Sequence, residues 1–141
     1  MEIGETMRRI LIIEDDISLR DNLSEILAME GYNPANGYDV IATDNGSSGV
    51  NFSLCLNPEL IICDINMPGF DGYTVLSQLR RFGRQTPFIF LTAKSEPRDI
   101  ERGICLGANL YVTKPYVLEE LISMVKRVLT DIPSPSSASK V

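Results

Sequence analysis

The segment "LIICDINMPGFDGYTVL" (residues 60–76) places a carboxylate at the point where a run of apolar residues stops. Residues 60–63 are continuously apolar, which is typical of a short strand buried on both faces of a parallel sheet. Asp64 follows directly, two residues before Asn66 and four before Pro68. An aspartate at this point is either a turn residue or part of a polar site. Other polar residues at the same place would favour the site.

Length and charge limit the function classes. The chain has 141 residues, 44% hydrophobic and 23% charged, which fits one globular domain with a sizeable core. Its net charge of −6 argues against nucleic-acid binding through its own surface. The sequence contains neither a run of about 18 apolar residues nor a secretory signal pattern. We therefore expect a cytoplasmic protein without membrane insertion.

Cysteine and histidine usage excludes further chemistry. Cys55, Cys63 and Cys105 lack CxxC spacing, so they predict small apolar fillers rather than disulfides or a zinc site. The chain has no histidine. A histidine-activated nucleophile and a phosphohistidine donor within this chain are therefore excluded.

Five short apolar runs with β-branched residues predict five strands, at residues 9–13, 39–43, 60–63, 88–91 and 110–113. Helical spacing lies between them and is clearest over 118–129. Strand and helix alternate, which predicts an α/β fold: a doubly wound five-stranded parallel sheet with helices on both faces.

Several element boundaries carry their own signals. Asp16 or Ser18 could cap the first helix, and Gly31 could close it. Residues 48–56 alternate as a strand would, but their place between two strands favours a helix. Residues 95–108 predict a short helix that ends near Gly107.

The chain divides into three parts by composition. We expect an N-terminal extension (1–7), one domain (8–130) and a flexible Pro/Ser-rich tail or linker (131–141). The connection near residues 32–37 is longer than the usual two to six residues, roughly. A tolerated surface insertion is favoured there over a partner-binding loop.

Polar residues follow four of the five predicted strands. Glu14, Asp15 and Asp16 follow the first strand, Asp64 the third, Thr92 the fourth, and Lys114 with Pro115 the fifth. In an open parallel sheet, ligands bind outside the carboxyl ends of the strands. Each residue alone would be an ordinary turn, cap or surface residue. Together they predict one site.

The chemistry of this set indicates phosphoryl transfer. Clustered carboxylates repel one another unless a cation is present, and hard oxygen ligands select Mg²⁺ or Mn²⁺. The Lys114 ammonium, the Thr92 hydroxyl and the amide of Ala93 could hold phosphoryl oxygens. Asp64 is the best-placed nucleophile and would form an acyl phosphate.

Four motifs, in order, resemble the response-regulator receiver domain of two-component signal transduction: "LIIEDD", "LIICDINMPGFDGY", "FIFLTAK" and "GANLYVTKPY". The resemblance covers roughly residues 8–130. It implies a flavodoxin-like sheet of order 2-1-3-4-5 and a cis bond between Lys114 and Pro115. It also implies a sensor histidine kinase or histidine phosphotransfer protein as phosphodonor, and a downstream effector protein or domain.

The resemblance further implies a role for each motif residue. Asp64 would be phosphorylated, and Thr92 and Lys114 would hold the phosphoryl group. Tyr111 would swing inward on activation, so Thr92 and Tyr111 form the switch. The implied metal site consists of Glu14, Asp15, Asp64 and the backbone carbonyl of Asn66, with Asp15 a direct ligand.

Some alternatives remain. A haloacid-dehalogenase-type phosphatase would need a second aspartate where Asn66 stands, and a flavodoxin relative would need a phosphate loop where three acids stand. We therefore expect a signalling domain that assists only its own phosphorylation and slow dephosphorylation. A degenerate receiver that binds partners without phosphorylation is the alternative. The chain would be a stand-alone receiver or part of a longer protein.

Homodimerisation on phosphorylation stays open. Asn109 and Leu110 stand where receivers of winged-helix transcription regulators usually carry acidic residues that pair across a dimer. Their presence weakens the prediction of that dimer.

Overall fold

The computed structural model describes residues 7–130. Five parallel strands form one sheet in the order β2-β1-β3-β4-β5, which confirms the predicted fold. The strands are β1 (Arg8–Ile13), β2 (Tyr38–Thr43), β3 (Leu60–Cys63), β4 (Phe88–Thr92) and β5 (Leu110–Thr113). Thr92 is thus the last residue of its strand rather than the first residue after it.

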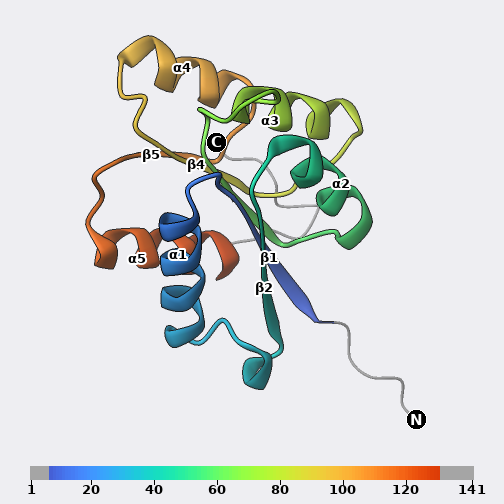
Figure 1. Cartoon of the computed structure of the whole chain (residues 1–141), viewed down its shortest axis with the longest axis vertical. Helices are drawn as coiled ribbons and strands as arrows, with labels where there is room; N and C mark the ends of the chain where they lie inside the picture. Colours follow the sequence, from blue (N-terminus) through green and yellow to red (C-terminus); the bar gives the residue numbers. More distant parts are fainter. Residues whose placement is uncertain (1–6, 131–141) are drawn as a thin grey trace.

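Helices cover both faces of the sheet. They are α1 (Ile17–Met29), α2 (Gly46–Leu56), α3 (Gly72–Arg81), α4 (Pro97–Cys105) and α5 (Leu118–Thr130). Helices α1 and α5 lie on one face, and α2, α3 and α4 lie on the other (Figure 1). The prediction of helices on both faces of the sheet is therefore confirmed.

Two hydrophobic layers sandwich the sheet, because successive side chains of a strand point to opposite faces. In β1, Ile10 and Ile12 pack in the layer beneath α1 and α5, whereas Leu11 and Ile13 pack in the layer beneath α2 and α3. Full burial of a side chain of this size stabilises the fold by about 1.5–3 kcal/mol. Burial on both faces explains why the central strands are apolar at nearly every position.

Segment 46–56 is a helix although its apolar residues alternate. The side chain of Asn45 caps it by accepting a hydrogen bond from the amide of Ser48 (2.8 Å). A Cβ added to Gly49 would lie 2.5 Å from Cδ1 of Ile13, so this glycine lets the helix approach β1 closely. The helix prediction is confirmed, and packing against the sheet decides it.

The ends of α1 and α4 follow local signals. Asp16 caps α1, accepting from the amide of Leu19 (3.2 Å), and Gly31 follows its end with a positive φ of 109°. Helix α4 is shorter than the predicted segment 95–108. It begins at Pro97, whose fixed φ suits a first helical turn, and it ends two residues before Gly107 (φ 112°).

The long connection before β2 forms a compact turn. A short 3-10 helix, η1 (Pro34–Asn36), occupies its centre. The side-chain amide of Asn33 donates to the carbonyl of Ala28 (2.8 Å), which ties the turn to the end of α1. Strand β2 then begins at Tyr38, opposite Arg8. That this loop is a tolerated insertion stays a prediction.

The predicted terminal segments are almost wholly outside the described residues. Of the extension 1–7 only Met7 is described, and the Pro/Ser-rich tail 131–141 is not. Among the helices of residues 7–130, none combines the length and the apolar character needed to cross a bilayer.

The cysteine prediction is right for one residue and wrong for two. Cys63 is buried in β3, whereas Cys55 on α2 and Cys105 on α4 are exposed, because each lies on the outer face of its helix. Burial, followed by the charge of Asp64, raises the pKa of the Cys63 thiol well above its ordinary value. This thiol is therefore both inaccessible and protonated.

We expect Ellman's reagent to titrate two thiols in the native protein and a third only after unfolding. Cys55→Ser and Cys105→Ser should each remove one fast thiol, while Cys63→Ser should remove the slow one. Three equally fast thiols in the native protein would contradict the burial of Cys63.

Candidate functional site

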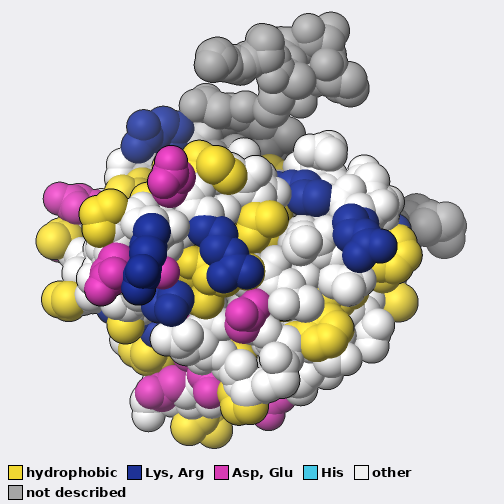
Figure 2. Space-filling model, turned by 90° about the horizontal axis from the view of Figure 1, so that it is seen from above, with side chains coloured by type: hydrophobic (Ala, Val, Ile, Leu, Met, Phe, Trp, Pro, Cys, Tyr) yellow, Lys and Arg dark blue, Asp and Glu magenta, His cyan; other side chains and the backbone are white. Residues whose placement is uncertain are grey.

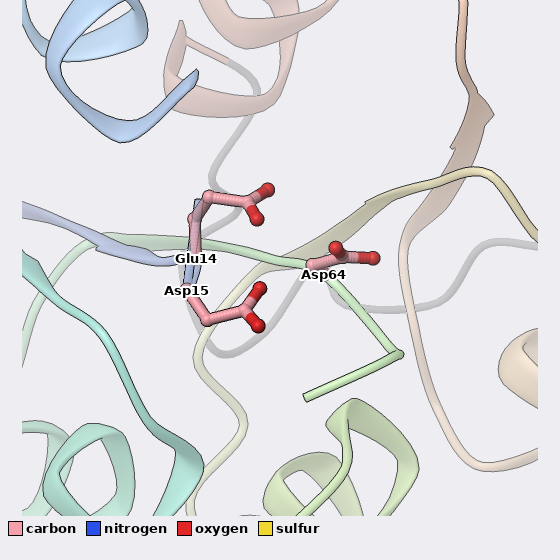
Figure 3. A group of neighbouring side chains, drawn as sticks. All are labelled: Glu14, Asp15 and Asp64. Atoms are coloured by element: carbon pink, nitrogen blue, oxygen red, sulfur yellow. The ribbon is translucent and has the colours of Figure 1, made fainter. Parts of the chain in front are cut away.

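Three carboxylates meet at the carboxyl ends of β1 and β3 (Figure 3). The strands are adjacent, with Ile13 opposite Cys63, and the amide of Asp64 donates to the carbonyl of Ile13 (3.0 Å). One carboxylate oxygen each from Glu14, Asp15 and Asp64 lie within 4.8 Å of one another. The predicted convergence of these carboxylates is confirmed, and a cluster of this kind can hold a metal ion.

The three carboxylates differ in exposure. Glu14 is 6% exposed and Asp64 9%, whereas Asp15 is open to solvent. Asn66 lies two residues beyond Asp64 in the loop that leads to α3, and it is exposed. The cluster therefore has a buried floor and an open side.

Lys114 brings one positive charge to this cluster from the end of β5. Its Nζ lies 3.1 Å from Oε1 of Glu14 and 3.5 Å from Oδ2 of Asp64. The amide of Lys114 donates to the carbonyl of Thr92 (2.8 Å), and Thr92 itself is fully buried. The Lys114–Pro115 bond is cis, as the resemblance implies.

Burial and neighbouring charges shift two pKa values in this site. Burial raises the pKa of Glu14, and the charge of Asp64 adds to this, against the amide of Asp16 and Lys114, which lower it. Burial lowers the pKa of Lys114, but Asp64 and Glu14 outweigh it, so the net shift is upward. Lys114 therefore stays protonated at neutral pH, and it faces more negative charge than it can offset.

The Asp64 side chain is held in a fixed orientation. Its Oδ1 accepts a hydrogen bond from the amide of Ile65 (2.6 Å), and its Oδ2 faces Lys114. One carboxylate oxygen thus orients the group by a backbone contact, while the other lies beside the ammonium. A carboxylate held in this way is a pre-positioned nucleophile.

Thr92 and Tyr111 both bond to Lys94, which lies in the loop after β4, three residues before α4 begins at Pro97. The hydroxyl of Tyr111 donates to the carbonyl of Lys94 (2.8 Å), and Oγ1 of Thr92 accepts from the amide of Lys94 (3.3 Å). The Tyr111 ring is half-buried, with its centroid 5.7 Å from that of Phe90. The inward movement of Tyr111 on activation stays a prediction.

Sequence reasoning assigned no role to Asp71 and Gly72, which begin α3 beside Asp64. Asp71 caps the helix by accepting from the amide of Thr74 (2.9 Å). A Cβ added to Gly72 would lie 2.3 Å from the carbonyl oxygen of Asp64. The Asp-Gly pair in the quoted motif is a helix-start signal that the sequence reasoning did not use, and the close approach depends on tertiary packing.

Charge is unevenly distributed over the surface. Residues 72–107 contain six basic residues and three acidic ones, although the whole chain carries −6. Figure 2 looks onto the end of the molecule that α3 and α4 form, and Lys and Arg side chains gather across it. A groove of about 250 Å³ between these helices is lined by Arg81 and Arg102, among others. This face is therefore basic, although the chain as a whole is acidic.

Comparison with known proteins agrees with this arrangement. Residues 10–126 match the response regulator receiver domain. The transcriptional regulatory protein DltR of Streptococcus agalactiae is 36% identical over 118 residues, which cover 84% of this chain and 50% of DltR. The DNA-binding dual master transcriptional regulator RpaA of Synechocystis is 38% identical over 140 residues, covering 96% of this chain and 56% of RpaA. The chain thus spans about half the length of these relatives.

Solved structures show the same likeness. The signal receiver domain of a histidine kinase from Syntrophus aciditrophicus superposes with a TM-score of 0.78 at 34% identity, covering 95% of this chain and 98% of that one. The response regulator TrrA from Thermotoga maritima, solved with Mg²⁺ and BeF, gives 0.75 at 32% identity, covering 87% and 100%. Fold and site define a signalling domain of two-component systems. The chain belongs to the response regulator receiver domain family.

We expect Gly72→Ala to lower the free energy of unfolding by roughly 1–3 kcal/mol, because the added methyl would overlap the backbone of Asp64. Urea denaturation measures the change. Ser77→Ala, at a half-buried position of the same helix, is the matched control and should cost less than about 0.5 kcal/mol. Equal stability of Gly72→Ala and the parent would refute the close approach.

Proposed function

We propose that this chain is a phosphoacceptor: Asp64 takes a phosphoryl group from a sensor histidine kinase or a histidine phosphotransfer protein, and the modified domain binds partners through an altered surface. The supporting observation is an oriented, nearly buried Asp64 carboxylate that lies beside Lys114, Glu14 and Asp15. Membership of the receiver family supports the same proposal.

The residues present divide the chemistry among them. A carboxylate oxygen of Asp64 attacks phosphorus, the bond from phosphorus to the donor's imidazole nitrogen breaks, and that nitrogen recovers its lone pair. Lys114 and the hydroxyl of Thr92 bind the transferred oxygens. Hydrogen bonds to developing charge are worth more in a preorganised site.

The donor set suits Mg²⁺, with Mn²⁺ as the alternative. Glu14, Asp15, Asp64 and the backbone carbonyl of Asn66 would supply hard oxygen ligands. The bound ion would neutralise charge between the acidic cluster and the phosphoryl group. The excess of carboxylates over the single ammonium of Lys114 is what favours a cation here.

Slow turnover follows from what stands near Asp64. A phosphatase of the haloacid-dehalogenase type needs a general acid two residues beyond its nucleophile, and Asn66 cannot donate a proton in that way. The domain would therefore assist its own phosphorylation and slow dephosphorylation only. A flavodoxin-like role is disfavoured, because carboxylates would repel a cofactor phosphate.

The switch would act on the loop after β4. A phosphoryl group on Asp64 would accept a hydrogen bond from the Thr92 hydroxyl and draw it away from the amide of Lys94, from which it now accepts. Tyr111 holds the carbonyl of the same residue. Phosphorylation would then shift the population of states that differ in this loop and in α4, within the face made by residues 95–128.

Partners and location belong to the same proposal. We assign residues 8–130 to the functional unit, with an upstream phosphodonor and a downstream effector protein or domain. We expect a cytoplasmic protein without direct nucleic-acid contact by this domain. Homodimerisation on phosphorylation is an outcome that size-exclusion chromatography would reveal.

Acetyl phosphate with Mg²⁺ should add one phosphoryl group, labile to base and hydroxylamine, that maps to Asp64 by mass spectrometry. Asp64→Asn should abolish the modification, while the exposed control Asp21→Asn on α1 should retain it. Phosphate that persists in Asp64→Asn, or that maps to Ser or Thr, would overturn the assignment. An unmodified parent protein would favour the degenerate, phosphorylation-independent receiver.

Mg²⁺ should raise the melting temperature, since a ligand that binds only the folded state stabilises it by about 1.4 kcal/mol at ten times its Kd. Asp15→Asn should shift the Mg²⁺ titration to higher concentration, because an exposed ligand is lost. Asp21→Asn is again the control. A melting temperature that ignores millimolar Mg²⁺ in the parent would refute the metal site.

A further inference from the structure

Helix α4 buries few of its own side chains against the rest of the domain. Of its nine residues only Gly103 is buried, and Ile104 and Cys105 face solvent. A Cβ on Gly103 would lie 2.9 Å from the Tyr111 ring, so the lack of a side chain at this glycine lets the ring pack against α4. Elements with few buried apolar contacts open at low free energy and supply the moving parts of switches.

Tyr73, on α3, fastens the first turn of α4 from the neighbouring helix. Its hydroxyl donates to the carbonyl of Asp99 (3.0 Å). The guanidinium of Arg102 lies over its ring, with Cζ 4.1 Å from the centroid, as in a cation–π contact. One side chain thus contacts two points of α4, a carbonyl near its start and an arginine near its end.

Tyr73 is itself anchored beside the phosphoacceptor. It is 3% exposed, and its ring packs edge-on against Phe90 at 5.6 Å. It directly follows Gly72, whose amide donates to the carbonyl of Ile65 (2.9 Å) and whose Cα packs against the backbone of Asp64. The backbone contact at Asp64 and the side chain that holds α4 therefore belong to consecutive residues.

We propose that Tyr73 is a positioning residue that couples the backbone around Asp64 to the first turn of α4, alongside Thr92 and Tyr111. The inference rests on the proposed phosphoacceptor function of Asp64. The two routes end close together, because Tyr111 holds Lys94, Tyr73 holds Asp99, and the Lys94 and Asp99 side chains lie 3.9 Å apart. Their effects on α4 should therefore not be additive.

Coupling of this kind is reciprocal. If phosphorylation of Asp64 changes the equilibrium between attached and loosened α4 by some factor, then the phosphorylation equilibrium differs between these two states of α4 by the same factor. If Tyr73 were only a core aromatic residue, substituting it would lower the global stability of the domain without altering the response of α4 to phosphorylation. Tyr73→Phe separates the two roles, because it keeps the ring and removes only the hydroxyl.

The first measurement is amide hydrogen exchange of the unphosphorylated protein. Tyr73→Phe should speed exchange in residues 97–103 by about fivefold, the effect of losing one ordinary hydrogen bond, and leave α5 unchanged. Tyr32→Phe is the matched control, since Tyr32 packs edge-on against Tyr38 beside β2 rather than against α4. Unchanged exchange in α4 of Tyr73→Phe would refute the attachment.

The second measurement is the response to acetyl phosphate and Mg²⁺. The change in α4 exchange on phosphorylation should be at least twofold smaller in Tyr73→Phe than in the parent and in Tyr32→Phe. Arg102→Gln, which removes the cation–π contact, should reduce it in the same direction, whereas Arg98→Gln at an exposed position of α4 should not.

The outcomes separate this inference from the function on which it rests. Faster exchange in Tyr73→Phe with an undiminished phosphorylation response would make Tyr73 a structural anchor and overturn the coupling. A parent protein that takes up no phosphate would refute the proposed function, and with it the coupling, while the exchange of unmodified α4 would still decide whether Tyr73 holds the helix.

Discussion

The contact of Lys114 with Glu14 and Asp64 is the interaction on which the site depends. Two unit charges about 4 Å apart interact by roughly 4 kcal/mol at an effective dielectric constant of about 20. One ammonium therefore cannot offset the mutual repulsion of Glu14, Asp15 and Asp64, whose oxygens lie within 4.8 Å of one another. The fold holds this unbalanced charge at the ends of three strands, and the excess of negative charge is what would favour a bound cation.

The sheet enforces this constraint through its register. Asp64 lies beside Glu14 because β3 pairs with β1 and the amide of Asp64 bonds to the carbonyl of Ile13. Lys114 arrives from β5, which is two strands away from β3 but ends at the same edge. The buried layers on both faces hold these strand ends in place. The electrostatic repulsion within the charge cluster is therefore offset by the stability of the core rather than by local structure.

Helix α4, unlike the charge site, is weakly attached to the rest of the domain. This helix has one buried residue; Tyr73 bonds to its first turn, and Tyr111 bonds to the loop that precedes it. A rigid charge site and a weakly attached helix on one scaffold are what a two-state switch needs, because a local charge change can bias only an element whose two states differ little in free energy. Under the proposed function, the basic face formed by α3 and α4 (Figure 2) would be the surface that such a change alters.

The sequence by itself determined the α/β class, the five strands and the polar residues at their ends, because nearly continuous apolar runs and carboxyl-end residues follow from the geometry of a buried parallel sheet. For residues 48–56 it gave an alternating pattern, and only their place between two strands favoured the helix; it placed Cys55 and Cys105 wrongly in the core. Only the tertiary structure decided these points and the roles of Gly72 and Tyr73. The reason is physical: close backbone approach and contact between helices depend on residues far apart in the chain, and no local periodicity records them.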